Sequence, residues 1–244
     1  MTTASNARFN AEALSWDSNP DVQLATTLAH KAYLSRLPPA ATLATYNVLD
    51  LGCGTGLLSL ALAPSVRSVT AVDAAEGMIA ALESKLGASA SSKSNRNVSA
   101  VCALLQDPDD ARLATDPATA TTKPGRRFDL VVSHLVLHHI PDLPALFRTM
   151  HGCLAPGGRV MVTDFEDFGP AARTFHPEAR MAGVERHGID RAQIRSVLEE
   201  AGFGDVKVET AFEMEKKVET EPGSGVMGPV VMFPFLICEG TRGG

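Results

Sequence analysis

Residues 47–60 read NVLDLGCGTGLLSL, and this stretch decides the fold. The apolar run that opens it is typical of a strand buried on both faces of a parallel sheet. Three alternating glycines, Gly52, Gly54 and Gly56, come next, and the apolar residues after them predict a helix that ends near Pro64. A strand, a glycine-rich turn and a helix leave backbone N–H groups and a helix N-terminus facing a ligand.

The spacing of the glycines separates two kinds of ligand. A dinucleotide site reads G-x-G-x-x-G and places a pyrophosphate on the helix N-terminus. Here the spacing is G-x-G-x-G, Leu57 takes the place of the third glycine of that pattern, and Asp50 lies two residues before Gly52. A carboxylate repels a pyrophosphate and attracts an ammonium group. The pattern therefore predicts a ligand with a positively charged end, with a nicotinamide dinucleotide as the alternative.

The stretch LDLGCGTG resembles the first motif of the class I S-adenosylmethionine (SAM)-dependent methyltransferases. Within that class the chain resembles small fungal metabolite methyltransferases of the UbiE-like, methyltransferase-11 type. Further landmarks follow in the family's order: an acid at Asp73, FDLVVSHLVLHHI at 128–140 and LAPGGRVMVTDFE at 154–166. The resemblance covers most of residues 45–165 and continues more weakly beyond. It implies SAM as the methyl donor and S-adenosylhomocysteine as the product.

The order of the elements predicts an α/β fold. We expect a Rossmann-like doubly wound sheet of seven strands, mostly parallel with an antiparallel C-terminal strand, and helices on both faces. The last two strands are expected at 205–211 and 232–238, joined by an exposed connection at 213–228. Residues 1–40 are expected to form an N-terminal helical lid segment, and residues 41–244 a single SAM-dependent methyltransferase domain.

The composition and net charge of the chain limit the kinds of binding partner that it can have. The chain has 244 residues, a net charge of -6 and an isoelectric point near 5.6, which disfavours a nucleic-acid surface. No apolar run approaches the roughly 20 residues of a membrane span, and the N-terminus lacks the apolar core of a signal peptide. Four cysteines without C-x-x-C spacing indicate reduced thiols and no metal site. We therefore expect a cytoplasmic protein without nucleic-acid or membrane partners; its oligomeric state stays open.

The cofactor residues follow partly from position and partly from the resemblance. Asp73 ends the second strand, where an acid holds ribose hydroxyls in doubly wound folds, although it could instead cap the next helix. Met78 could pack on an adenine ring or belong to the core. The resemblance places the adenine at Gln106 and Asp107, with the neighbouring acids leaving the choice open. The complete expected set is Asp50, Gly52, Cys53, Gly54, Gly56, Asp73, Ala74, Met78, Gln106, Asp107, Ser133 and His134.

Methyl transfer needs a base only if the acceptor must lose a proton. The candidates are His134, His138 and, behind them, His139, because an imidazole accepts a proton near neutral pH. For each of them a structural role or a place beside the cofactor is the more common alternative. Phe9 and Trp16 are expected either in a lid over cofactor and substrate or in a helix packed on the sheet edge. The following helix is expected to be capped by Asp21.

Two other stretches complete the outline. Residues 87–97 are small and polar and predict an exposed loop, and residues 108–127 predict a surface insertion with little structure. Residues 169–188 carry several arginines and histidines without apolar periodicity. They either shape the substrate side of the site, as the resemblance implies, or form a solvated loop.

Absent signatures narrow the acceptor. The sequence after the fourth strand is SHLV, without the Asn/Asp-Pro-Pro-aromatic signature of DNA and protein-glutamine amino methyltransferases. Ser133 stands where catechol-type enzymes place a metal-binding acid, and the chain has no Pro-Cys pair for attack on cytosine. The sequence thus predicts a metal-independent enzyme that methylates O, N or S of a small molecule, by analogy a secondary metabolite or a thiol. A protein methyltransferase, a noncatalytic SAM-binding regulator and a nicotinamide-dependent oxidoreductase remain alternatives.

Overall fold

The protein is described by a computed structural model for residues 3–88, 96–113 and 127–244. Most of the predicted loop at 87–97 and of the predicted insertion at 108–127 lies outside these residues. The strands are β1 (Asn47–Leu51), β2 (Ser68–Asp73), β3 (Val98–Cys102), β4 (Phe128–His134), β5 (Leu154–Phe165), β6 (Phe203–Glu219) and β7 (Met227–Arg242). The α-helices are α1 (Thr3–Trp16), α2 (Pro20–Leu34), α3 (Ala40–Leu43), α4 (Leu57–Leu62), α5 (Glu76–Ala88), α6 (Leu143–Cys153) and α7 (Arg191–Glu200). Short 3-10 turns are η1 (Ala63–Ser65), η3 (Ala111–Leu113), η4 (Leu137–His139), η5 (Pro170–Phe175) and η6 (Glu178–Arg180).

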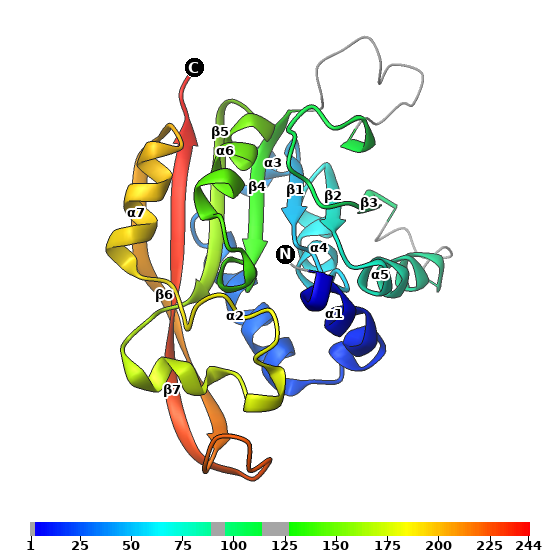
Figure 1. Ribbon diagram of the computed structural model, residues 1–244. Helices are drawn as coiled ribbons and strands as arrows, with labels where there is room; N and C mark the ends of the chain where they lie inside the picture. Colours follow the sequence, from blue (N-terminus) through cyan, green and yellow to red (C-terminus); the bar gives the residue numbers. More distant parts are fainter. Residues whose placement is uncertain (1–2, 89–95, 114–126) are drawn as a thin grey trace.

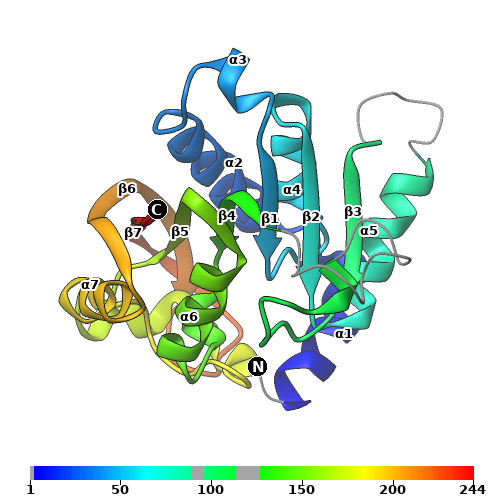
Figure 2. The same cartoon turned by 90° about the horizontal axis from the view of Figure 1, so that it is seen from above.

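The strands form one seven-stranded sheet in the order β3-β2-β1-β4-β5-β7-β6 (Figure 1). Strands β1 to β5 pair in parallel, whereas β7 runs antiparallel to both of its neighbours. Helices α2, α3 and α4 cover one face, and α6 and α7 cover the other (Figure 2). The predicted fold class, including the single antiparallel strand, is confirmed.

The two-sided burial of the central strands explains their continuous apolar runs. On β1, Val48 packs into a cluster with Leu58 of α4, while Leu49 packs into a second cluster with Phe147 of α6. Both strand residues are fully buried. Because side chains alternate between the faces of a strand, a strand covered on both faces must be apolar at every position. Asp50 is the exception in this strand, and it belongs to the site described below.

The C-terminal strands are much longer than predicted. Strand β7 pairs with β6 as far as Met227 with Glu219, so the expected exposed connection at 213–228 is wrong. Along β6, buried Met214 and Val218 alternate with exposed charged residues. This period-2 pattern is typical of a strand with one buried face. The many charged residues on the exposed face make the same sequence resemble an exposed loop. The connection shrinks to residues 220–226.

The start of α2 also differs from the expectation. Asn19 is the N-cap, and its side-chain oxygen accepts from the backbone N–H of Asp21 at 3.0 Å, with Pro20 at the first helical position. Asp21 is therefore not the cap, and its carboxylate pairs with Lys216 of β6. Near its other end α2 is fixed to the sheet by the buried hydroxyl of Tyr33, which lies 2.7 Å from the carbonyl oxygen of residue 133 and 2.8 Å from a threonine hydroxyl on β5.

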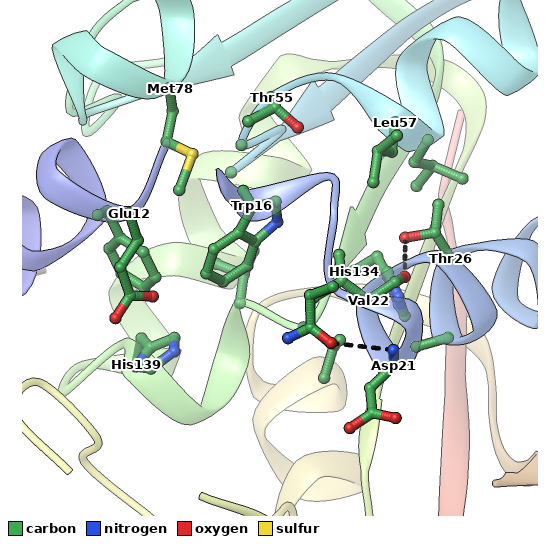
Figure 3. Close-up of a pocket in the computed structure, with 18 of the residues that line it drawn as sticks. Glu12, Trp16, Asp21, Val22, Thr26, Thr55, Leu57, Met78, His134 and His139 are labelled. Carbon is green, nitrogen blue, oxygen red and sulfur yellow. Dashed lines mark hydrogen bonds between the residues drawn. The ribbon is translucent and has the colours of Figure 1, made fainter. Parts of the chain in front are cut away.

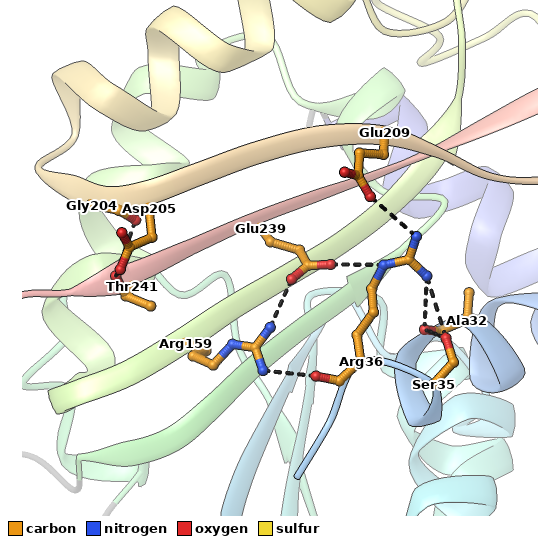
Figure 4. A network of polar contacts seen from close by, with 9 residues as sticks. All are labelled: Ala32, Ser35, Arg36, Arg159, Gly204, Asp205, Glu209, Glu239 and Thr241. Atoms are coloured by element: carbon orange, nitrogen blue, oxygen red, sulfur yellow. Dashed lines mark hydrogen bonds and ion pairs between the residues drawn. The ribbon is translucent and has the colours of Figure 1, made fainter.

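A second anchor of α2 is an ion network with the last strand (Figure 4). The carboxylate of Glu239 contacts Arg36 at 3.0 Å and Arg159 at 2.7 Å, and Arg159 also donates to the carbonyl oxygen of Arg36 at 2.9 Å. The Glu239 side chain is only 9% exposed, whereas Glu209, which contacts Arg36 at 3.5 Å, is 59% exposed. The network therefore contains one buried and one exposed carboxylate that share an arginine.

Glu239→Ala is expected to lower the free energy of unfolding by about 2 kcal/mol, because it leaves two part-buried guanidinium groups without their carboxylate partner. Glu209→Ala removes an exposed partner of the same Arg36 and should cost no more than about 0.5 kcal/mol. Urea unfolding of both variants measures the difference. Equal losses would show that burial of the carboxylate does not govern the network.

Candidate active site

The three glycines of the first motif play different parts. All have positive φ angles, +77° at Gly52, +54° at Gly54 and +81° at Gly56. A Cβ atom at Gly52 would overlap the side chain of Val136, and one at Gly56 would overlap Leu82. A Cβ at Gly54 would meet no atom within 4 Å. Two of the glycines thus allow close packing of the chain, whereas Gly54 borders open space.

Two buried acids flank this turn. Asp50 is 1% exposed and accepts from the hydroxyl of Ser59 at 2.5 Å. Burial raises the pKa of the Asp50 carboxyl to about 7, with a smaller contribution from the charge of Asp73. Asp73 accepts from the backbone N–H of Gly54 at 2.9 Å and from that of Ala75 at 2.8 Å. Burial raises its pKa too, while these hydrogen bonds act in the opposite direction. Asp73 therefore shapes the glycine turn and caps α5 at the same time.

A cavity of about 150 Å³ opens in front of the turn, at the carboxyl ends of the parallel strands. Figure 3 shows side chains from α1, α2, α5 and the segments after β1 and β4 converging on it. The residues expected from the sequence that line it are Phe9, Trp16, Asp50, Gly52, Cys53, Gly54, Asp73, Met78, His134 and His138. A smaller adjoining pocket is lined by Ala74 together with Gly52 and Asp73. The carboxyl edge of a doubly wound sheet is where such folds bind ligands.

Four expected cofactor residues do not line either pocket. Gly56 packs against α5, and the hydroxyl of Ser133 is buried, donating to the carbonyl oxygen of Leu51 at 2.7 Å. Gln106 and Asp107 are exposed, and the Asp107 carboxylate accepts from the next turn of its own loop. These four residues are thus not among those that line the cavity or the adjoining pocket. For Gln106 and Asp107, the chain has already turned away from the sheet.

The residues after β3 that do face the smaller pocket are Ala103, Leu104 and Leu105. Leu104 is exposed despite its size, whereas Leu105 is buried. They were not foreseen from the sequence, because the resemblance implies an acid at this position. An apolar patch that faces open space beside Asp73 suits a flat ring better than an acid in the exposed loop does.

Helix α1 lies beyond the carboxyl ends of β1 and β2, beside α5 (Figure 1), and its residues Phe9 and Trp16 line the cavity. Phe9 packs against Trp16 edge to face, with ring centroids 5.8 Å apart, and both contact Met78 of α5 in one apolar cluster. Just beyond α1, Asp17 accepts from the hydroxyl of Thr55 and forms an ion pair with Lys85. These contacts join α1 to the glycine turn, and Asp17 was not foreseen as part of the site.

His134 is a poor general base. Its Nδ1 lies 2.8 Å from the hydroxyl of Thr163, and burial lowers the pKa of the imidazole to about 4. A base with so low a pKa gives little driving force for removing a proton from an acceptor near neutral pH. His134 lies in the cavity wall beside α2 (Figure 3).

His138 is better oriented. Its Nδ1 lies 2.8 Å and 2.9 Å from the two oxygens of Asp164, which also accepts from the backbone N–H of His138 at 3.1 Å. Its Nε2 is buried without a hydrogen-bond partner among the described residues. The neighbouring ring of His139 uses Nδ1 to reach the carbonyl oxygen of Gly183 at 2.7 Å. Burial lowers the pKa values of His139 and His176, so both rings are neutral.

The segment 169–188 contributes directly to the cavity. Phe175, His176 and Arg180 line it, which favours the substrate-side interpretation over a solvated loop. Phe175 stacks on Phe165 with ring centroids 4.1 Å apart, and the backbone N–H of Glu185 donates to the carbonyl oxygen at residue 138. Only the content of arginine and histidine in this segment hinted at its role, since no periodic pattern marks these residues.

Comparison with known proteins agrees with this geometry. Residues 23–208 match the family described as "Methyltransferase domain". The chain therefore belongs to that family, and its seven-stranded sheet is the fold of class I SAM-dependent methyltransferases, as the sequence predicts. Membership in this family excludes the nicotinamide-dependent oxidoreductase.

Individual relatives span different acceptors. The chain is 29% identical over 175 residues to a phosphoethanolamine N-methyltransferase of Triticum aestivum, covering 70% of this chain and 30% of that protein. It is 33% identical over 123 residues to a ubiquinone biosynthesis O-methyltransferase of Pseudomonas aeruginosa, covering 50% and 46%. The chain thus spans less than half the length of either curated relative. Among solved structures, the DhpI–SAH complex superposes with a TM-score of 0.64 at 21% identity, covering 98% of this chain and 96% of that one.

Within the described residues, no helix has the length and apolar character needed to cross a membrane. The four cysteines are free: Cys153 and Cys238 are buried, Cys53 is half-buried and Cys102 is exposed. Burial raises the pKa of the Cys53 thiol at the cavity well above its usual range, so this side chain is neutral there.

Proposed function

We propose that the protein transfers a methyl group from SAM to an O, N or S atom of a small molecule. The observation that carries the proposal is one cavity that joins a glycine turn and two buried acids to a wall of histidines. The first part suits the donor, and the second part suits an acceptor. When bound, SAM supplies a methyl group on a positively charged sulfur, so the protein's task is to orient both partners and exclude water.

The residues at the donor end fit SAM. Open space at Gly54 lets a ligand approach the backbone, where a side chain would stand in the way. Asp50 lies on the cavity wall and would hold the ammonium group, and Asp73 retains lone pairs for ribose hydroxyls beyond its two backbone contacts. Leu104 and Leu105 would flank the adenine. A buried acid pair next to a glycine turn favours a cation over a pyrophosphate.

The acceptor end is lined by neutral rings and a few charges. Phe9, Phe175 and the histidines supply flat apolar walls, while Arg180 and Lys216 reach the same cavity. Such a mixture suits a compact organic molecule with a polar group. The relatives named above methylate small molecules at nitrogen or oxygen, which supports the same substrate class here. A secondary metabolite, including a thiol, fits this description.

Helix α1 is the part of the predicted 1–40 lid that is placed to act as one. Its Phe9 and Trp16 cover the cavity, and it is joined to the rest of the site through Asp17. Helix α2 is fixed to the sheet through Tyr33, so it belongs to the body of the domain. We therefore propose that the lid is limited to α1 and is shorter than the segment 1–40 expected from the sequence.

Calorimetry with SAM, S-adenosylhomocysteine and NAD tests the donor, and the first two should bind while NAD does not. Transfer of a radiolabelled methyl group into a metabolite extract, compared with a protein extract, tests the acceptor class. Label in protein would favour the alternative of a protein methyltransferase. SAM binding with no label in either extract would favour a noncatalytic regulator.

The raised pKa of Asp50 predicts a pH dependence. An ammonium group beside Asp50 favours the ionised carboxylate, so SAM binding should release a proton and become roughly tenfold tighter between pH 6 and pH 7.5. Without ligand the sign is opposite for folding: the raised pKa means that stability falls as pH rises from about 4 to about 7. Calorimetry in buffers of different ionisation enthalpy measures the released proton.

Asp50→Asn is the control for this effect. It keeps the shape of the side chain and should bind SAM weakly at both pH values, without the pH dependence. Wild-type protein that binds SAM equally well at pH 6 and pH 7.5 would remove Asp50 from the ammonium site.

A further inference from the structure

Three histidine side chains meet at one wall of the cavity. One ring nitrogen each of His138, His139 and His176 lies within 4.8 Å of the other two. The first two come from η4, and the third follows η5, so two distant segments build the cluster. Ring centroids are 3.9 Å apart for His138 and His139, and 4.9 Å apart for His138 and His176. All three line the cavity, which gives the cluster a path to solvent.

The hydrogen-bond partners of two of the rings determine which ring nitrogen carries a proton. A carbonyl oxygen can only accept, so Nδ1 of His139 carries the proton that it donates to Gly183. The Asp164 carboxylate likewise accepts from Nδ1 of His138. The Nε2 atom of the neutral His139 ring is therefore a bare lone pair, and the neutral form of His138 with its proton on Nδ1 presents a bare Nε2 as well. Nε2 of His138 and Nδ1 of His176 are buried without a hydrogen-bond partner among the described residues.

We propose that His138, His139 and His176 bind a divalent transition-metal ion such as Zn²⁺. Three imidazole nitrogens with an open position form the ligand set of many catalytic zinc sites. Histidines that bind metals almost always donate their other ring N–H to a carboxylate or a carbonyl oxygen, and Asp164 and Gly183 provide both kinds of partner. An ion would also satisfy lone pairs that no donor reaches.

The surrounding charges permit a divalent cation. Asp164 lies directly behind one ring and contributes a negative charge. Arg8 and Lys216 lie near the cluster and oppose a cation. Each of them has an acid beside it, since Arg8 is close to Glu12 and Lys216 is paired with Asp21. Glu12 also contacts Arg180 at 3.7 Å, so the acids offset part of the opposing charge before an ion binds.

If the proposed function holds, an ion at this site would favour methyl acceptors that carry a metal-binding atom. Its open position faces the cavity, where a thiolate, an alkoxide or an amine of the acceptor would bind. Coordination favours the deprotonated form of a thiol or hydroxyl, whose proton passes to solvent. This proposal departs from the sequence-based expectation of a metal-independent enzyme. That expectation rested on the cysteine spacing and on the residue at Ser133, neither of which belongs to this cluster.

The test uses the full chain after treatment with a chelator. Co²⁺ titration should reveal one ion per chain by its visible absorption, and Zn²⁺ should displace it. His176→Ala should weaken binding at least tenfold, and Asp164→Asn by about ten- to a hundredfold. His151→Ala, on α6 outside the cavity, is the matched control and should bind as the wild type does. Cys102→Ser removes an exposed thiol and should also leave binding unchanged.

Wild-type protein that binds neither ion, or His176→Ala that binds as tightly as the wild type, overturns the proposal. Circular dichroism checks that His176→Ala is folded, and His139→Gln is the second variant if it is not. SAM affinity of the chelator-treated protein, measured in the same series, tests the donor site separately. SAM binding without a bound ion would leave the proposed function intact even if the histidines bind no metal.

Discussion

Gly54→Ala is expected to weaken SAM binding at least about a hundredfold, or about 2.7 kcal/mol. Gly54 lines the cavity, and a Cβ atom there would meet no protein atom within 4 Å. The new methyl group would therefore occupy the space through which the ligand reaches the backbone. Calorimetry measures the loss of affinity, and thermal unfolding measures the cost of the left-handed backbone.

Gly157→Ala is the matched control. Gly157 also has a positive φ angle, +77°, and also has no atom within 4 Å of an added Cβ, but it is exposed near the start of β5, where the register with β4 shifts. Both variants should lose about 1 kcal/mol of stability from the left-handed conformation. Only Gly54→Ala should lose SAM affinity. If Gly54→Ala kept its affinity, the ligand would not approach the glycine turn.

Asp73→Ala is expected to weaken SAM binding by ten- to a hundredfold, or about 1–3 kcal/mol, through lost hydrogen bonds. Asp73 accepts from the backbone N–H groups of Gly54 and Ala75 and would accept from ribose hydroxyls as well. The variant should therefore lose both the ligand contacts and the shape of the turn. Calorimetry with SAM and S-adenosylhomocysteine checks the loss for donor and product alike.

Asp142→Ala separates binding from capping. Asp142 is an exposed N-cap that accepts from the backbone N–H of Ala145 at 2.8 Å, on a helix outside the cavity. Its loss should cost about 1 kcal/mol of stability and no SAM affinity. If Asp73→Ala behaves in the same way, Asp73 is only a cap, which is the alternative that its position at the end of a strand left open.

The core of the fold was predictable because its signals are local. Strand β1, the glycine turn and α4 follow the predicted order, and β2 ends at Asp73 as expected. A strand covered on both faces gives a short continuous apolar run, and the turn residues that flank it distinguish it from a buried helix. The long C-terminal strands were not predictable in length, because β6 has only one buried face and carries many charges. Pro20 did signal the start of α2, and it points to Asn19 as the cap.

The donor side of the site was more predictable than the acceptor side. Asp50, Gly54 and Asp73 lie next to strand ends, so their meeting follows from the parallel sheet. Gln106 and Asp107 line neither pocket, and the order of residues in a loop does not fix which of them faces the sheet. His176 reaches His138 only through the folding of segment 169–188, and no local pattern encodes that contact.

Strand β6 ends the sheet, and its outer edge has no partner strand in the described part of the chain. Exposed Glu209, Glu213, Glu215 and Lys217 follow this edge, and its register with β7 is interrupted at three places. A second molecule that approached edge to edge would bring like charges together and would meet a strand with an irregular hydrogen-bonding pattern. The molecule can thus carry a long open sheet edge with little tendency to grow into larger β-aggregates.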